Sequence, residues 1–186
     1  MDYSVNMVSA DSPSLHDRLV DRALALVEEG GADVSLRAVA RAAGVSAMAP
    51  YRHFEDKAAL LAAVALRGFG LMEAVAREAD AVHDPAEALT AQGLAYIGFA
   101  RTHPALFQLM FADNAGLALP HDECRGAYRL MARRVEQLCP ADADAGALAC
   151  WGLVHGLATL ALDGRLPPDP VLERAALGIM TRGLAK

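Results

Sequence analysis

The sequence has few aromatic residues and few cysteines. Aromatic side chains make up 5% of the 186 residues, whereas hydrophobic residues make up 54%, so the apolar mass is mainly Ala, Leu and Val. This composition argues against a sheet protein and favours helices. The three cysteines, Cys124, Cys139 and Cys150, do not form an even set. We therefore interpret them as reduced, mostly buried thiols and exclude a disulfide framework.

Long hydrophobic runs and a secretion signal are also missing. Arg, Asp or Glu interrupts every apolar stretch before it reaches the length of a membrane span. The first residues contain no positively charged segment followed by an apolar one. We therefore expect a cytoplasmic protein with no membrane partner.

Residues that would mark an enzyme do not stand out. We find no nucleophile–base pair, no glycine-rich phosphate loop and no paired carboxylates, so we expect no enzymatic activity and no cofactor. His121 and Cys124 have the spacing of half a metal site, but no second pair accompanies them. No metal site is predicted.

The chain as a whole lacks positive charge, with a formal net charge of −6. Residues 68–186 contain ten basic and fourteen acidic side chains. The stretch Val34–Phe54, in contrast, contains Arg37, Arg41 and Arg52 and no acidic residue. A locally basic face of this kind can bind DNA while the rest of the molecule repels it.

The stretch Val34–Leu61 predicts two short helices around a tight turn. Ser35 can cap a first helix whose apolar residues recur at helical spacing, and Gly44 can end it in the left-handed conformation. Ser46 then caps a second helix, Ala47–His53. This arrangement is a helix-turn-helix, whose second helix enters the major groove of DNA.

Helical patterns continue along the rest of the chain. We predict further helices at residues 14–29, from Asp56 through Val75, Pro85–Arg101, Pro104–Phe111, His121–Cys139, Asp142–Asp163 and Val171–Ala185. Gly68 and Gly70 fall inside the helix that starts at Asp56. They could mark a hinge or a close contact with a neighbouring helix, and the sequence leaves both open.

Two runs in the basic stretch carry a family resemblance. They are Ser35-Leu-Arg-x-Val39-Ala40 and Gly44-Val-Ser-x-x-x-x-Tyr51-Arg-His-Phe54-x-x-Lys57-x-x-Leu60-Leu61. Together they resemble the TetR family of transcriptional regulators. Farther along, Trp151-Gly-Leu-Val-His-Gly156 and the upstream His103–Phe107 are similar to the Trp-His-Gly (WHG) signature of one TetR C-terminal subgroup.

The resemblance implies an all-α fold with two domains. Residues 14–58 would form the helix-turn-helix DNA-binding domain, and residues 59–186 a helical ligand-binding and dimerisation domain. Residues 1–13 are expected to be a flexible arm. The implied function is that of a homodimeric repressor, which binds a palindromic operator in double-stranded DNA and is released by a small apolar or amphipathic effector. The alternative is an all-α small-molecule sensor or enzyme that does not bind DNA.

The resemblance also implies which residues contact DNA. Contacts to the backbone or to base edges fall to Ser35, Arg37, Ser46, Tyr51, Arg52, His53 and Lys57, and base reading falls to Arg37, Ala47, Met48 and Ala49. Because alanine and methionine cannot form bidentate hydrogen bonds with bases, readout would rest on apolar contacts and arginine. In the alternative interpretation, Tyr51 and Phe54 are core residues and the charges are merely solvated.

In the second domain we expect a mostly apolar pocket and a dimer interface. The pocket would be lined by some of Phe99, Phe107, Met110, Phe111, Tyr128, Trp151 and His155. Trp151 and His155 lie four residues apart on one helix face and could instead be core residues. Gly152 and Gly156, one turn apart, would let helices approach closely at an interface that also includes Ala175 and Ile179.

Overall fold

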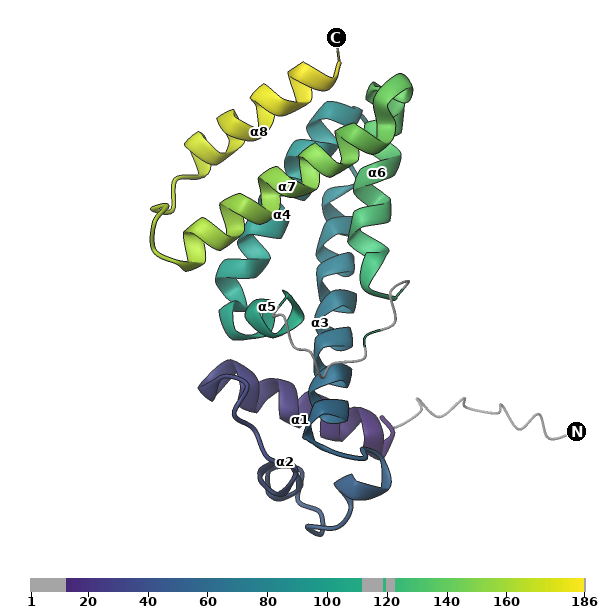
Figure 1. The fold of residues 1–186 in the computed structure, drawn as a ribbon, viewed down its shortest axis with the longest axis vertical. Helices are drawn as coiled ribbons and strands as arrows, with labels where there is room; N and C mark the ends of the chain where they lie inside the picture. The colour runs from purple at the N-terminus through teal and green to yellow at the C-terminus, as the bar shows by residue number, and fades with distance from the viewer. Residues whose placement is uncertain (1–12, 112–118, 120–122, 186) are drawn as a thin grey trace, which may run out of the picture.

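The computed structural model describes residues 13–111, 119 and 123–185, and within these ranges the chain is helical without a strand. The predicted fold class, all-α, is confirmed. Eight α-helices run through these ranges (Figure 1): α1 (Leu15–Gly30), α2 (Leu36–Ala42), α3 (Lys57–Ala79), α4 (Pro85–Thr102), α5 (Pro104–Phe111), α6 (Gly126–Leu138), α7 (Ala143–Leu162) and α8 (Pro170–Leu184). Three short 3-10 helices accompany them: η1 (Pro50–Arg52), η2 (Glu123–Arg125) and η3 (Pro140–Asp142). The predicted flexible arm lies outside the described residues, except for Pro13.

Predicted helix caps position the N-terminal unit, which consists of α1, α2, η1 and the start of α3. The Ser35 hydroxyl accepts a hydrogen bond from the Ala38 N–H at 3.2 Å. The Asp56 carboxylate accepts one from the Ala59 N–H at 2.8 Å and so opens α3. The apolar residues of these elements meet in one core, which includes Leu19, Val27, Leu36, Val39, Phe54 and Leu60.

The turn that ends α2 has the conformation predicted from the sequence. Gly44 has a φ of 68°, in the left-handed region that glycine adopts at little cost. The Val45 N–H donates to the Ala40 carbonyl at 3.0 Å, and the Gly44 N–H donates to the Arg41 carbonyl at 3.2 Å. These two bonds form a Schellman motif, which sets the direction in which the chain leaves α2.

The prediction of a regular helix at Ala47–His53 is wrong. The structure has a turn after Ser46, followed only by η1 at Pro50–Arg52. Pro50 lacks an N–H, so the first α-helical hydrogen bond, to the Ser46 carbonyl, cannot form. The Ala49 N–H donates to that carbonyl instead, at 2.9 Å. The second element of the helix-turn-helix is therefore short and tightly wound.

Helix α3 joins the N-terminal unit to a larger bundle and packs against α1, α4, α5 and α6 (Figure 1). A Cβ atom on Gly68 would lie 2.6 Å from Met110 Sδ and 2.9 Å from Leu106 Cδ1, both on α5. A Cβ atom on Gly70 would meet no described residue within 4 Å. Of the two alternatives for Gly68, close packing therefore holds, and α3 continues without a break through both glycines.

Helix α4 lies inside the bundle, where it packs against α3, α6, α7 and α8. The Arg101 guanidinium donates hydrogen bonds to both carboxylate oxygens of Glu173, and Glu173 is 4% exposed. A Cβ atom on Gly93 would lie 2.9 Å from Leu177, so α4 and α8 approach closely. These contacts fix one side of α8 on α4 and leave the opposite side uncovered.

Two segments, α3 and Pro140–Leu162, are long and apolar enough to cross a membrane by length and composition. The prediction that no apolar stretch reaches the length of a membrane span is therefore wrong. A helix can have this length and this mean hydropathy with a few charged residues in it. Both segments pack against other helices of the bundle, α3 against α4 and α6, and α7 against the same two helices. Core helices of soluble proteins have the same length and composition.

Candidate functional site

Most residues predicted to contact DNA lie exposed on the N-terminal unit. We call this exposed set the motif face: Ser35, Arg37, Ser46, Ala47, Met48, Tyr51, Arg52 and His53. Ala49 and Lys57 are half-buried. Met48 is 66% exposed and Tyr51 is 45% exposed, and both are large side chains that folding would otherwise tend to bury.

The motif face is held from beneath by Pro50 and Phe54. Pro50 is fully buried, and Phe54 is 4% exposed with its ring centroid 5.0 Å from that of His16 on α1. The interpretation in which Tyr51 and Phe54 are both core residues therefore holds for Phe54 alone. The buried ring anchors the segment and leaves the hydroxyl-bearing Tyr51 ring exposed at the surface.

Lys57 already has a partner within the chain. Its Nζ donates to Asp33 Oδ1 at 3.0 Å. The Lys57 side chain is 43% exposed and the Asp33 side chain is fully exposed. An exposed ion pair of this kind contributes little to stability, because water screens both charges. A phosphate group could therefore replace Asp33, but any contact between Lys57 and DNA competes with this ion pair.

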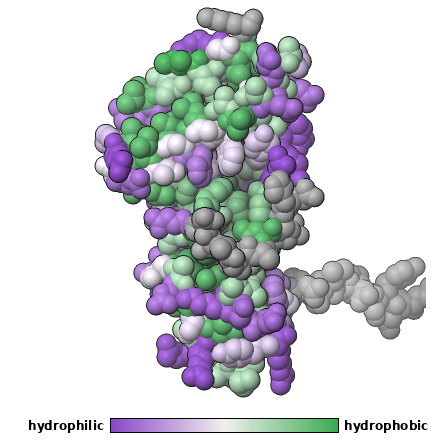
Figure 2. All heavy atoms as spheres, viewed as in Figure 1, coloured by the Kyte–Doolittle hydropathy of each residue, from purple (hydrophilic) through white to green (hydrophobic). Residues whose placement is uncertain are grey.

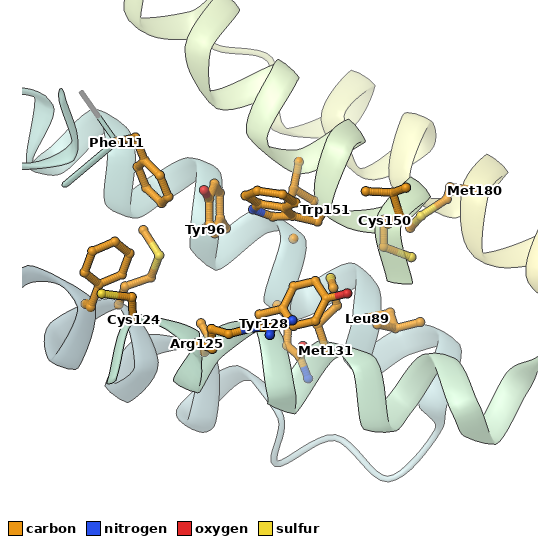
Figure 3. Close-up of a pocket in the computed structure, with 18 residues that line it drawn as sticks. Leu89, Tyr96, Phe111, Cys124, Arg125, Tyr128, Met131, Cys150, Trp151 and Met180 are labelled. Carbon is orange, nitrogen blue, oxygen red and sulfur yellow. The ribbon is translucent and has the colours of Figure 1, made fainter. Parts of the chain in front are cut away.

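A cavity of about 510 Å³ lies in the bundle, between α3, α4, α6 and α7 (Figure 3). Helical spacing builds its wall, because residues at i, i+3 and i+7 share a face. On α3 and α4 these residues are Phe69, Met72, Ala76, Leu89, Gln92, Gly93 and Tyr96. The other elements contribute Phe111, Cys124, Arg125, Ala127, Tyr128, Met131, Leu148, Cys150, Trp151, Val154 and Met180. The wall is mostly apolar and the volume suits a small organic molecule.

Aromatic and polar side chains face the cavity from two sides, Tyr96 and Trp151 from one and Arg125 and Tyr128 from the other (Figure 3). The rings of Tyr128 and Trp151 are 6.1 Å apart in a T-shaped arrangement, and the guanidinium carbon of Arg125 lies 4.9 Å from the Tyr128 ring. The Tyr96 hydroxyl is 2.9 Å from His155 Nδ1. Burial raises the pKa of Tyr96 and lowers the pKa of His155. Both groups are therefore neutral at neutral pH.

The cavity wall contains one deeply buried thiol, that of Cys150. Burial raises the pKa of the Cys150 thiol to about 11, so this thiol is protonated and a poor nucleophile. Among the residues that the structure describes, no group of three or more His, Cys, Asp or Glu side chains is placed to hold a metal ion.

The structure brings three of the predicted ligand residues into the cavity wall: Phe111, Tyr128 and Trp151. His155 lies behind the wall, where it contacts Tyr96 and where its ring centroid is 5.9 Å from that of Trp151.

The structure places Phe99, Phe107 and Met110 outside the wall, as core residues that are 3–5% exposed. Met110 packs on Gly68 of α3, and Phe99 packs on His103 at the end of α4. Helix α5 is apolar on nearly all sides, so its sequence could not indicate which side faces a cavity.

Sequence reasoning missed the walls that α3 and α4 provide. The available signal was the spacing of Gln92 and Tyr96, polar residues three and seven positions after Leu89 on the buried face of α4. Gln92 is 5% exposed, and its Nε2 donates to Asp80 Oδ1 at 2.6 Å. Arg134 Nε donates to the same oxygen at 2.7 Å.

Helices α7 and α8 carry exposed apolar residues. We call this set the outer face: Gly152, Leu160, Val171, Leu172, Ala175 and Ile179. Val171 is 79% exposed and Ile179 is 67% exposed. In Figure 2, hydrophobic side chains gather over these two helices. A Cβ atom on Gly152 or on the half-buried Gly156 would meet no described residue within 4 Å.

Comparison with known proteins identifies two regions of the chain that match family models. Residues 19–64 match the model for bacterial regulatory proteins of the tetR family, and residues 89–180 match the model for a tetracyclin repressor-like C-terminal domain. The second region contains the cavity-lining Trp151. No curated protein matches the chain in sequence.

Solved structures share the fold along nearly the whole chain. A protein of unknown function from Rhodococcus sp. RHA1 is 33% identical, with a TM-score of 0.83 over 96% of this chain and 100% of that chain. A bacterial regulatory protein in the tetR family from Rhodococcus RHA1 is 20% identical, with a TM-score of 0.65 over 93% of this chain and 98% of that chain. The TetR family transcriptional regulator PfmR from Thermus thermophilus is 22% identical, with a TM-score of 0.60 over 92% of this chain and 97% of that chain.

Proposed function

Because the chain belongs to the TetR family of transcriptional regulators, we propose that it is a ligand-responsive repressor that binds a palindromic operator as a homodimer. TetR-family regulators bind DNA and typically act as dimers with small-molecule effectors. The observation that carries the proposal is the course of α3. Lys57 opens this helix beside the motif face, and Phe69, Met72 and Ala76 of the same helix line the cavity.

The motif face would position the protein on DNA and read a few bases. Arg52, His53 and the Tyr51 hydroxyl are suited to phosphate contacts, which fix register without reading sequence. Base reading would fall to Arg37 and to the short side chains around Met48. At 66% exposure, the Met48 side chain is available for an apolar contact with a thymine methyl group.

The outer face would form the dimer interface. Exposed apolar residues such as Val171, Leu172 and Ile179 are costly in a monomer and are typical of an interaction surface. Gly152 and Gly156 leave room for a helix of the second copy to approach closely. A two-fold axis through this interface would present two motif faces to half-sites about 34 Å apart.

The effector would act by shifting a population of dimer states. The ligand would bind more tightly to a dimer state whose motif faces are spaced wrongly for the operator. It would lower the affinity for the operator by at most the ratio of its own affinities for the two dimer states. We assign residues 14–58 to the DNA-binding domain and residues 59–186 to the ligand-binding and dimerisation domain. Since α3 starts at Lys57, this helix links the two domains.

The same family membership supports a cytoplasmic regulator that is not an enzyme. TetR-family regulators are soluble cytosolic proteins, and their domains point to a transcription factor. An enzyme built on the cavity would convert its ligand to a product, whereas a regulator releases DNA and leaves the ligand unchanged.

Selection of DNA tests the proposal. The purified full chain is used to enrich duplexes from a random library, and the enriched sequence is then titrated with the protein by fluorescence anisotropy. We expect an inverted repeat whose half-site centres are separated by about 10 base pairs or a multiple of that distance. Failure to enrich any sequence at low salt would contradict DNA binding and favour a sensor that acts through other partners.

A further inference from the structure

Among the described residues of the cavity wall, Arg125 is the one with a charged side chain. It stands directly before α6 and is exposed, so a molecule that enters the cavity can reach it. The rest of the wall is mostly apolar. A single charged group beside an apolar pocket fixes the orientation of a ligand and selects its charge. The position of Arg125 therefore bears on the chemical class of the effector.

Arg125 forms no ion pair within the described part of the chain. Other arginines of the bundle do: Arg77 pairs with Glu73, Arg101 with Glu173 and Arg134 with Asp80. The guanidinium carbon of Arg125 lies instead 4.9 Å from the centre of the Tyr128 ring. Both side chains face Trp151 across the cavity (Figure 3). Stacking on a ring steadies a guanidinium and leaves the N–H donors in its plane available for an anion.

A groove of about 570 Å³ lies beside the cavity, and Arg125 and Tyr128 belong to the walls of both. Arg129 and Arg133 line the groove as well, because residues four apart on α6 share one face. Both are exposed, and neither forms an ion pair with a described residue. An apolar cavity and a row of free guanidinium groups thus meet at Arg125.

Two carboxylates also line the groove, those of Glu136 and Asp144. Glu136 lies about three helical turns beyond Arg125, and Asp144 is in the first turn of α7. The groove is therefore positive where it meets the cavity and becomes mixed in charge toward the end of α6. An anion is favoured at the cavity end, between Arg125 and Arg129.

We propose that the effector is an apolar chain that ends in an anionic group, a carboxylate or a phosphate. The chain fills the cavity, and the anionic group lies between Arg125 and Arg129. This inference rests on the ligand-responsive function proposed above and names the chemical class of its effector. At this exposed position the charge keeps part of its hydration while the chain is buried, so the large cost of burying an ion is avoided. Because η2, which ends at Arg125, and α6 both pack against α3, the anionic group is held beside the helix that leads to the motif face.

Four probes with the same ten-carbon chain separate the alternatives: decanoate and decyl phosphate are anions, 1-decanol is neutral and decyltrimethylammonium is a cation. Trp151 is the single tryptophan of the chain and lines the cavity, so its fluorescence reports binding to the full-length protein. Calorimetry gives a second measure. An apolar cavity without a cation would prefer the alcohol, because a charged group loses more hydration. We expect instead that at least one anion binds about tenfold more tightly than 1-decanol, and the better anion identifies the group as carboxylate or phosphate.

Three variants locate the effect. Arg125→Gln removes the charge, so the better anion and 1-decanol should bind with affinities within about twofold of each other. Arg125→Lys keeps the charge without the planar fork and should retain part of the preference. Arg165→Gln makes the same change at an exposed arginine that lines neither the cavity nor the groove, and it should keep the full tenfold preference. A thermal melt checks that each variant folds, and the comparison of probes on the wild-type chain needs no variant.

Several results would overturn the proposal. If the wild type bound 1-decanol or the cation as tightly as both anions, the arginines would not select the effector. A preference that survives in Arg125→Gln would place the anion at another residue, and an equal loss in Arg165→Gln would trace the effect to net charge. Binding of none of the probes would also contradict it. Since these measurements contain no DNA, a chain that prefers the anions but never releases an operator would contradict the proposed function alone.

Discussion

The two glycines of α3 provide a matched pair of substitutions. Gly68→Ala and Gly70→Ala make the same chemical change two residues apart in one helix. Both replace glycine by the best helix former, which stabilises a helix interior by about 1 kcal/mol. They differ in their surroundings, because Gly68 faces Met110 and Leu106 of α5 whereas Gly70 is exposed.

The expected effects therefore have different signs. For Gly70→Ala the only expected effect is the higher helix propensity of alanine. We therefore expect the free energy of unfolding to rise by about 1 kcal/mol and the Tm by about 2–4 °C. For Gly68→Ala the new Cβ would lie 2.6 Å from Met110 Sδ, and overpacking of this kind costs about 1–3 kcal/mol. The net change at Gly68 should then lie between about zero and a loss of 2 kcal/mol.

Urea and thermal unfolding of the full chain measure both variants, at one protein concentration because association would add to the apparent stability. The structure predicts that Gly70→Ala melts above the wild type and Gly68→Ala at or below it. If Gly68→Ala were stabilised as much as Gly70→Ala, the contact between α3 and α5 would be loose. The explanation of Gly68 by close packing would then be refuted.

Three further predictions concern DNA, the dimer and pH. If Lys57 contacts phosphate, Asp33→Asn should strengthen binding to the selected duplex by about two- to fivefold per subunit, an effect that should vanish in Lys57→Ala. Ile179→Glu places like charges across the proposed interface and should give a monomer in sedimentation velocity; an unchanged dimer would move the interface elsewhere. Burial lowers the pKa of His155 below 6.5, so the unfolded chain takes up its proton first and stability should fall as pH decreases from 7 to 5. In urea unfolding, His155→Gln should lose less stability than the wild type between pH 7 and 5. An equal loss in both proteins would show that His155 is not the group responsible.

The helices and the motif could be predicted because their signals are local. Ser35 and Asp56 each stand directly before a helix and cap it in the structure. Gly44 indicates its turn because glycine adopts the left-handed conformation at little cost. The prediction of a regular second motif helix was wrong because of Pro50. The N–H that this single residue lacks outweighs the helical pattern around it.

The cavity could not be derived in the same way, because it depends on how distant helices meet. Phe107 and Phe111 lie one turn apart on the same apolar helix, yet only Phe111 reaches the wall. The sequence gives no reason to prefer one of them. The better signal was a polar residue on a buried helix face, as Gln92 is on α4, and it becomes informative only when its neighbours are known.

The central claim is that the motif face binds duplex DNA. The most direct test is the salt dependence of binding to the selected duplex, for the wild type and for the double variant Arg37→Ala, Arg52→Ala. A dimer of the double variant lacks four positive charges at the motif faces. The plot of log affinity against log salt should therefore be shallower by about 2 from the two Arg52 side chains, and by up to about 4 to the extent that Arg37 also lies against phosphate. Equal slopes for the two proteins would show that DNA does not bind at this face.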